Sequence, residues 1–294
     1  MSRNQTYWGL ALGGGGFLGF AHIGVLMALR LYGLTPSLIA GTSAGGAVVG
    51  LLAAGVNITG IEDGAMALAS AEGIIDDEPV ILPSGASRAY SLGIKGLIRG
   101  GIIESWFDRL AGGKRMCDAQ MPVAITAVDV ETGEEVVFTN CPPRYRTSIL
   151  GAGTGKVYVS DVKISEAIRA SISLPGVFVP KKLHGRTLVD GGVRNMVPAD
   201  ELKRMGAREV VAVDLGSHAE KPQKVDNVIG VLSRCFALAC RREVERSLTE
   251  HASIILQPEV WDVGFPTASK ARALIESGKA CVEKNIDRLL SILQ

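Results

Sequence analysis

The hydrophobic positions of the chain form short continuous runs that alternate with longer segments of helical composition. Residues 7–12 are an apolar run that predicts a buried strand, and a glycine-rich turn separates it from an apolar helix at residues 20–31. The same order returns with a strand at residues 37–40 and a helix at residues 47–54. Strand, glycine turn and helix in alternation are typical of a parallel sheet covered by helices.

The remainder of the chain continues this alternation. Further strands are predicted at residues 122–130, 134–139, 177–179, 187–189, 209–215 and 253–256. Further helices are predicted at residues 59–71, 103–110, 165–171, 198–206, 226–248 and 270–293. We find no repeat, low-complexity tract or linker, so we expect a single domain over residues 1–294. The predicted fold class is α/β, with three layers and a mostly parallel central sheet.

The composition excludes some classes of function. The chain has 294 residues, 47% of them hydrophobic, and its 31 basic and 30 acidic residues leave a net charge of +1. A chain of this length buries enough surface to fold without a disulfide or metal staple. The balanced charge provides no field that would attract a phosphate backbone, so nucleic acid is not an expected partner.

The cysteines and the apolar segments indicate a cytoplasmic protein. The five cysteines form no Cys-x-x-Cys pair and no zinc-site pattern, which is typical of free thiols in a reducing compartment. The N-terminal apolar run is too short for the core of a signal peptide. The uncharged stretch over residues 31–61 is broken by Pro36 and several glycines. Its longest smooth part, residues 44–56, is shorter than the ~20 residues that a membrane span needs.

The second strand–helix junction carries a nucleophile motif. Gly41-Thr42-Ser43-Ala44-Gly45 has the pattern G-x-S-x-G, in which a sharp turn exposes the serine hydroxyl and leaves room only for small neighbours. The pattern is short, and a plain glycine turn would produce it as well. A strand before it and a helix after it are the context that the motif requires, so Ser43 is the candidate nucleophile.

The first junction holds a glycine loop suited to binding an anion. Gly14, Gly16 and Gly19 fit the pattern G-x-G-x-x-G, which occurs in dinucleotide-binding sites. That fingerprint also needs an acidic residue at the end of the second strand, and the chain has none between Arg30 and Ile61. A nicotinamide cofactor is therefore disfavoured. Backbone N–H groups before a helix also suit the oxyanion of a tetrahedral intermediate.

A serine nucleophile needs a group that accepts its proton. Ser43, Asp214 and His251 occur in the chain order Ser, Asp, His of α/β-hydrolases, so a triad of these residues is one arrangement. Asp190 offers another, because a predicted strand delivers it and two glycines after it let the backbone turn tightly. His22 lies inside a predicted helix, where a packed or a surface position explains it. An aspartate in an ordinary turn would look the same, so the residues alone leave these alternatives open.

Three motifs together resemble the signatures of the patatin-like phospholipases. They occur in the family's order and at suitable separations. They are Gly14-Gly15-Gly16-Phe17-Leu18-Gly19, Gly41-Thr42-Ser43-Ala44-Gly45 and Asp190-Gly191-Gly192. Residues 170–175 are similar to the family segment A-S-x-x-x-P, and Asn195 with Pro198 resembles the family's ending beyond D-G-G. The resemblance covers residues 7–215.

The resemblance implies a serine acyl hydrolase that acts on lipid esters or other carboxylic esters. The family uses a Ser/Asp dyad, which implies Ser43 as the nucleophile and Asp190 as the base. It also implies that no metal or cofactor is needed. Backbone amides of the glycine loop would form the oxyanion hole: Gly14, Gly15 and Gly16. The other motif glycines would support the turns: Gly19, Gly41, Gly45, Gly191 and Gly192. The family commonly has arginine or lysine where this chain has Leu18.

Two rival functions follow from the same residues. An α/β-hydrolase-type esterase would use the Ser43/Asp214/His251 triad. A non-catalytic lipid- or nucleotide-binding module would keep the glycine loops without catalysis. The sequence does not fix the oligomeric state.

One segment suits contact with lipid. Residues 73–100 break the regular pattern and predict a surface excursion, and we expect a lid or cap at about residues 73–112. Within it, residues 88–109 interleave apolar and basic side chains, which favours peripheral contact with a membrane. A packed cap would have the same composition.

Overall fold

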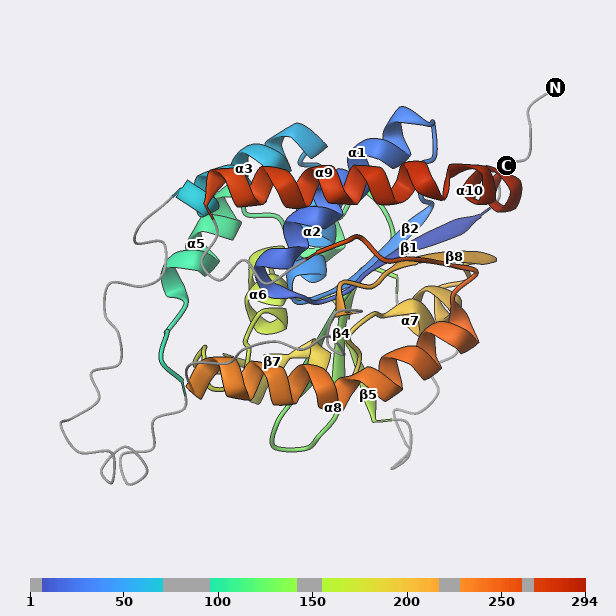
Figure 1. Ribbon diagram of the computed structural model, residues 1–294. Coiled ribbons are helices and arrows are strands. Elements are labelled where there is room, and N and C mark those ends of the chain that lie inside the picture. Colours follow the sequence, from blue (N-terminus) through green and yellow to red (C-terminus); the bar gives the residue numbers. More distant parts are fainter. Residues whose placement is uncertain (1–6, 71–95, 142–154, 217–227, 261–266) are drawn as a thin grey trace.

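The computed structural model has three layers, a sheet with helices on both of its faces (Figure 1). The helices α1, α2, α3, α5, α6 and α9 pack on one face, and α7 and α8 pack on the other. The predicted three-layer α/β class is therefore confirmed. The structure describes residues 7–70, 96–141, 155–216, 228–260 and 267–294.

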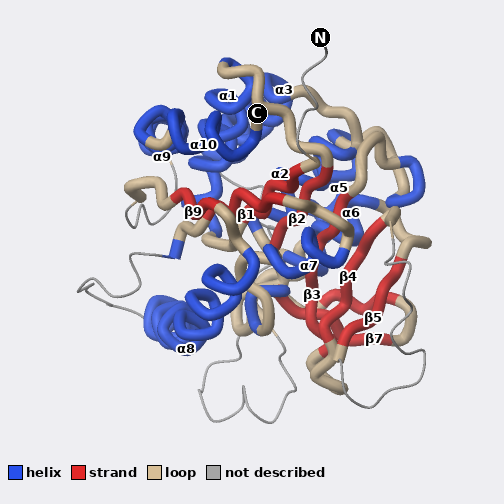
Figure 2. The backbone as a smooth tube through the Cα atoms, turned by 90° about the vertical axis from the view of Figure 1, so that its right-hand side faces the viewer, coloured by secondary structure: helices blue, strands red, loops and turns tan. Residues whose placement is uncertain are grey.

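The strands form one sheet in which the path β5-β4-β3-β2-β1-β8-β9 joins seven strands (Figure 2). Off this path, β7 pairs with β3, and β6 pairs with β7. In the stretch β3-β2-β1-β8-β9 of this path, each strand pairs in parallel with the next. The predicted mostly parallel sheet is therefore confirmed. The strand bounds are β1 (Trp8–Leu12), β2 (Leu38–Thr42), β3 (Val123–Asp129), β4 (Glu135–Thr139), β5 (Lys156–Val159), β6 (Lys181–Leu183), β7 (Arg186–Asp190), β8 (Glu209–Val213) and β9 (Ile254–Leu256).

The helices follow most of the predicted segments. Their bounds are α1 (Phe20–Leu31), α2 (Ala44–Ala53), α3 (Ile58–Ser70), α5 (Gly101–Leu110), α6 (Ile164–Ser171), α7 (Ala199–Arg204), α8 (Val228–His251), α9 (Ala268–Lys284) and α10 (Ile286–Leu293). Short 3-10 turns lie at η1 (Gly16–Gly19), η2 (Met116–Asp118) and η3 (Gly191–Val193).

Alternate residues of the central strands face the two helical layers. Trp8, Leu10 and Leu12 of β1 belong to the core that α1 and α9 cover, whereas Ala11 belongs to the core that α7 and α8 cover. Side chains alternate between the faces of a strand, so a strand that is buried on both faces is apolar throughout. This explains why β1 has no polar residue.

Glycines bring α1 and α9 into close contact. A Cβ atom on Gly24 would lie 1.8 Å from the carbonyl oxygen of Ile275, and one on Gly278 would lie 2.0 Å from that of Ala21. Only glycine allows the two helix backbones to approach so closely. The region after residue 215, which carries no sequence motif, thus supplies helices to both layers and the edge strand β9.

Strand β3 brings two strand ends together. One edge of β3 pairs with β4, so its other two neighbours, β2 and β7, share the opposite edge. β2 runs parallel to β3, and its last residue, Thr42, lies opposite Thr126. β7 runs antiparallel to β3, and its last residue, Asp190, lies opposite Ala127. The two strands therefore end head to head at adjacent positions of β3.

Several sequence predictions of elements were wrong. Residues 177–179 are not a strand and contribute only an isolated bridge through Phe178, whereas the strand of this hairpin is β6. β5 was missed because it is a four-residue, half-buried strand at the end of the sheet path, without a long apolar run. The single helix expected at 270–293 is divided at Asn285 into α9 and α10.

Candidate active site

Ser43 occupies a strained turn between β2 and α2. Its backbone has φ 54° and ψ −121°, a conformation that residues other than glycine rarely adopt. A Cβ atom on Gly45 would lie 2.0 Å from the carbonyl oxygen of Leu12, and one on Gly41 would lie 2.4 Å from that of Gly45. These contacts explain why small residues flank the serine. Its backbone N–H donates a 2.7 Å hydrogen bond to the hydroxyl of Ser171.

Asp190 is buried at the end of β7, beside Ser43. The Gly192 N–H donates a 2.8 Å hydrogen bond to Oδ1 of Asp190, and the Ser43 side chain donates a hydrogen bond to the same carboxylate. Burial raises the pKa of Asp190 from its ordinary value to about 6, while the hydrogen bonds from Ser43 and Gly192 oppose that rise. The carboxylate is thus ionised at neutral pH and is a stronger base than an exposed aspartate.

The glycine loop lies against the serine turn. A Cβ atom on Gly14 would lie 3.3 Å from Cβ of Ser43, and one on Gly19 would lie 2.5 Å from Cβ of Ala44. The Gly14 N–H donates a 2.9 Å hydrogen bond to the carbonyl oxygen of Met196. Within the described part of the chain, no partner is recorded for the N–H groups of Gly15 and Gly16.

This pattern corrects one detail of the sequence prediction. Gly14, Gly15 and Gly16 were expected to offer three amides to an oxyanion, but the amide of Gly14 already holds the chain after Asp190. The Gly14 N–H is engaged because the chain around Met196 lies against the glycine loop and accepts this hydrogen bond. Two amides of the loop, those of Gly15 and Gly16, remain as donors.

His22 supports the glycine loop, a role that its sequence context did not reveal. Its Nε2 lies 2.7 Å from the carbonyl oxygen of Gly13, so this nitrogen carries the proton and donates. Burial lowers the pKa of His22 to about 4, while the hydrogen bond to Gly13 opposes that fall. The imidazole is therefore neutral at physiological pH. The sequence prediction that His22 lies inside a helix is confirmed, and of the packed and surface positions that it allowed, the structure has the packed one.

The residues of the rival triad are engaged elsewhere. Asp214 forms a 2.8 Å ion pair with Arg241, and Nδ1 of His251 lies 2.9 Å from the carbonyl oxygen of Ser247 in its own helix. Among the described residues, no hydrogen bond or ion pair joins Asp214 or His251 to Ser43. The structure thus brings Asp190 to the serine, and it does not bring Asp214 and His251 there.

The segment predicted to contact membranes is largely packed where it is described. Residues 71–95 lie outside the described residues. They include most of the expected lid and residues 88–95 of the segment predicted to contact a membrane. In α5, Phe107 is buried and Trp106 packs against the main core, whereas Ile102 is 43% exposed. Leu18, at the position where a cation was expected, also packs against this core. Among the described helices, none has both the length and the apolarity that crossing a bilayer requires.

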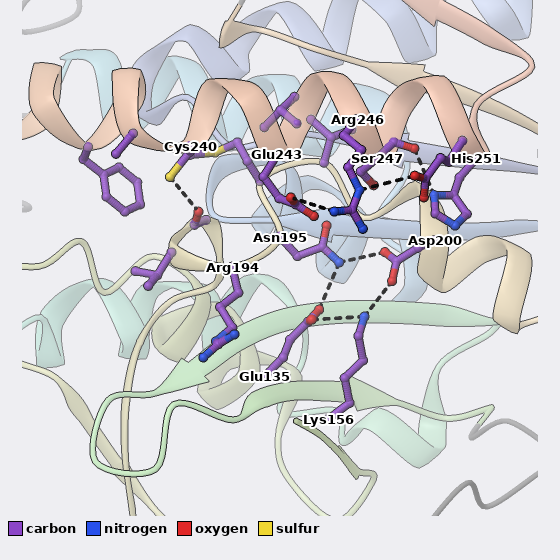
Figure 3. Close-up of a pocket in the computed structure, with 18 of the residues that line it drawn as sticks. Glu135, Lys156, Arg194, Asn195, Asp200, Cys240, Glu243, Arg246, Ser247 and His251 are labelled. Carbon is purple, nitrogen blue, oxygen red and sulfur yellow. Dashed lines mark hydrogen bonds and ion pairs between the residues drawn. The ribbon is translucent and has the colours of Figure 1, made fainter. Parts of the chain in front are cut away.

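A cavity of about 620 Å³ lies between α8 and the chain that follows Asp190 (Figure 3). Gly192, Met196 and Cys240 belong to its wall. The Cys240 thiol lies 3.3 Å from the carbonyl oxygen of Gly192, and burial together with the nearby Asp190 carboxylate raises the pKa of this thiol. The cavity therefore adjoins the Asp190 turn.

The family of the chain is decided by a comparison over most of its length. The family model described as patatin-like phospholipase matches residues 10–203, which include Ser43 and Asp190. The chain belongs to this family. The family resemblance inferred from the three motifs is thereby confirmed.

Two relatives of this patatin-like protein extend well beyond the part that aligns with it. A lysophospholipase NTE1 of Debaryomyces hansenii is 30% identical over 217 residues, which cover 71% of this chain and 12% of the relative. An uncharacterized NTE family protein of Mycobacterium tuberculosis is 31% identical over 219 residues, which cover 73% of this chain and 51% of the relative. The chain thus spans about half or less of the length of these relatives.

Solved structures share the fold at low sequence identity. VipD from Legionella pneumophila aligns with a TM-score of 0.55 and 14% identity, over 97% of this chain and 67% of that chain. Human GIVD cytosolic phospholipase A2, solved in complex with methyl gamma-linolenyl fluorophosphonate, aligns with a TM-score of 0.53 and 13% identity, over 98% and 59%. These likenesses show the fold of the patatin-like protein.

Proposed function

We propose that this patatin-like protein hydrolyses carboxylic esters of lipids, with Ser43 as the nucleophile and Asp190 as its base. The observation that carries the proposal is that adjacent strand ends place Ser43 beside the buried Asp190 carboxylate, where its side chain acts as a hydrogen-bond donor that lowers the pKa of Asp190. A nucleophile and a base within hydrogen-bond reach are the minimum that nucleophilic catalysis needs. The raised pKa of Asp190, about 6, suits a general base that works near neutral pH.

The reaction has two halves. In the first, Oγ of Ser43 attacks the ester carbonyl carbon as Asp190 takes the hydroxyl proton. The tetrahedral intermediate then collapses, and the alcohol leaves with that proton, so that an acyl group remains on Ser43. In the second half, Asp190 takes a proton from water, which attacks the acyl carbonyl. The fatty acid leaves, and the proton returns to Oγ of Ser43.

The glycine loop would stabilise the charge that develops on the carbonyl oxygen. The N–H groups of Gly15 and Gly16 have no recorded partner within the described residues and lie next to Gly14, which adjoins Ser43. Fixed backbone donors stabilise an oxyanion in the transition state, and removal of one such donor costs about 10²–10³-fold in rate in other enzymes. We assign these two amides to the oxyanion hole.

The substrate class follows from the family and its neighbours. A relative named lysophospholipase and a structural neighbour named phospholipase A2 favour phospholipids or lysophospholipids. Acylglycerols contain the same ester bond and belong to the same proposal.

Hydrolysis of a lipid panel tests the proposal. The panel contains a lysophospholipid, a diacyl phospholipid, a monoacylglycerol and a water-soluble chromogenic ester. We expect the wild type to hydrolyse at least one of them, and Ser43→Ala to lose this activity. Ser291→Ala, at an exposed serine of α10, is the matched control and keeps it. Activity that survives Ser43→Ala would contradict the proposal. A wild type that binds lipid without hydrolysis would also contradict it and would favour the binding module.

A further inference from the structure

A chain of buried hydrogen bonds connects the serine turn to the segment after Asp190. The hydroxyls of Thr42 and Thr126 lie 2.7 Å apart, and the Thr42 hydroxyl donates a 2.7 Å hydrogen bond to the backbone carbonyl oxygen of Asn195. Thr42 and Thr126 are fully buried, and Asn195 is 8% exposed. Since the Thr42 proton is donated to Asn195, the Thr126 hydroxyl must donate to Thr42.

The side chain of Asn195 is held by a buried group of charges. Its amide nitrogen donates to Glu135 at 3.0 Å and to Asp200 at 2.8 Å, as Figure 3 shows. Lys156 lies 3.0 Å from Glu135 and 2.6 Å from Asp200, and it also forms an ion pair with Glu201. We call Glu135, Lys156, Asp200 and Glu201 the acidic clamp. Its members come from β4, β5 and α7.

The clamp is satisfied internally. Both amide protons of Asn195 are used, and the carboxylates of the clamp share Lys156. Burial opposes the charge on Lys156, but the neighbouring Glu135, Glu201 and Asp200 outweigh it and raise its pKa. Asn195 and three clamp residues, Glu135, Lys156 and Asp200, line the cavity, yet their side-chain polar groups are already engaged with one another. This favours a supporting role over direct binding of a ligand.

We propose that Thr42 and Asn195 are positioning residues that fix the distance between Ser43 and Asp190, and that the acidic clamp holds Asn195 in place. Thr42 directly precedes the nucleophile. The N–H of Asn195 donates a 2.8 Å hydrogen bond to the carbonyl oxygen of Gly191, the residue that directly follows the base. The Thr42–Asn195 hydrogen bond therefore ties the two turns together across the head-to-head strand ends. This inference rests on the proposed Ser43/Asp190 function.

The proposal has a kinetic consequence. A shift of about 1 Å between reacting groups reduces rates by up to about 10²-fold, without comparable loss of substrate binding. Neither Thr42 nor Asn195 needs to touch the substrate for this to hold. Loss of the Thr42–Asn195 hydrogen bond should therefore lower kcat much more than it changes KM.

The test compares two substitutions of one side chain. Thr42→Val keeps the shape and removes the hydroxyl, whereas Thr42→Ser keeps the hydroxyl. On a water-soluble ester we expect Thr42→Val to lower kcat roughly 10–100-fold with KM changed less than about threefold. Thr42→Ser should restore kcat to within about threefold of the wild type. Thermal unfolding shows that the compared proteins are folded at the assay temperature.

A pH profile separates positioning from a general loss of structure. The Ser43 hydrogen bond lowers the pKa of Asp190, so a weakened contact should let this pKa rise. The acidic limb of kcat/KM should then move to higher pH in Thr42→Val and stay in place in Thr42→Ser. Asn195→Ser provides a second route, because it withdraws the amide from Glu135 and Asp200 but leaves the backbone carbonyl for Thr42.

The outcomes decide between the two proposals. If Thr42→Val does not fold, Asn195→Ser decides. A loss of kcat that is smaller than the loss expected for Thr42→Val, with little change of KM, supports the inference. A folded Thr42→Val or Asn195→Ser with wild-type kcat and an unmoved acidic limb overturns it and leaves the proposed function intact. A wild type that hydrolyses no ester, or a fully active Asp190→Asn, overturns the proposed function and this inference together.

Discussion

Ser43 and Asp190 meet because the strands that precede them end head to head on one edge of β3. Thr42 lies opposite Thr126 and Asp190 lies opposite the next residue, Ala127. β2 runs parallel to β3 along residues 123–126, and β7 runs antiparallel to it along residues 127–129, so the two strands run toward each other. The geometry thus places a serine that follows one strand beside a carboxylate that ends the other, and the predictions below test what this arrangement does.

The base can be identified by comparing substitutions of Asp190 and of His251, the base of the rival triad. Asp190→Asn should lower kcat for an ester substrate by about 10²–10⁴-fold, because an amide cannot accept the serine proton. His251→Ala should stay within a few-fold of wild type, because the His251 Nδ1 contact is to its own helix. Steady-state kinetics of the purified variants give the answer. The reverse pattern would favour the Ser43/Asp214/His251 triad.

The rate should depend on the ionisation of Asp190. The base is active as a carboxylate, and its pKa is about 6. We therefore expect kcat/KM for a soluble ester to rise with pH and to level off above an acidic limb near pH 6. An acidic limb near pH 4, the range of an ordinary aspartate, would show that the active base is not this buried carboxylate.

The same carboxylate should reduce stability at alkaline pH. Its folded-state pKa lies above the ordinary value of 3.8, so between about pH 4 and pH 6 the native protein binds more protons than the unfolded chain. The contribution of Asp190 to stability therefore falls as pH rises through this window. Asp190→Asn should be more stable than wild type at pH 8 by about 1–3 kcal/mol, and the difference should shrink toward pH 4. Urea unfolding at several pH values measures it, and a difference independent of pH would contradict the assignment.

The glycine after Ser43 should tolerate no side chain. A Cβ atom on Gly45 would lie 2.0 Å from a backbone oxygen of β1, which cannot move without disturbing the sheet. Gly45→Ala should lower the free energy of unfolding by about 3 kcal/mol or more. Gly101→Ala is the matched control, because a Cβ atom there meets nothing within 4 Å. Equal stability of the two variants in urea unfolding would be inconsistent with the packing described here.

The sequence could indicate the fold class and the serine at the centre of the site. Close backbone contacts at Gly41 and Gly45 require glycine, and such positions leave a readable pattern around Ser43. The alternating apolar runs likewise record strands that are buried on both faces. These signals are local, so a single sequence contains them.

The supporting residues could not be predicted in the same way. Glu135, Lys156 and Asp200 resemble ordinary surface charges in the sequence, and only the pairing of distant strands and helices buries them together. The choice between Asp190 and Asp214 also depends on β3, a strand far along the chain from Ser43, whose Thr126 pairs with Thr42. The commitment of the Gly14 amide to Met196 is a long-range contact of the same kind.

Identification of the residue that a fluorophosphonate modifies tests the central claim most directly. The reagent phosphonylates an activated serine, and peptide mass spectrometry locates the added group. We predict modification of Ser43 in the wild type, its loss in Ser43→Ala, and labelling slowed by about 10²-fold or more in Asp190→Asn. Labelling of another serine, or equally fast labelling of Ser43 in Asp190→Asn, would contradict a Ser43 nucleophile activated by Asp190.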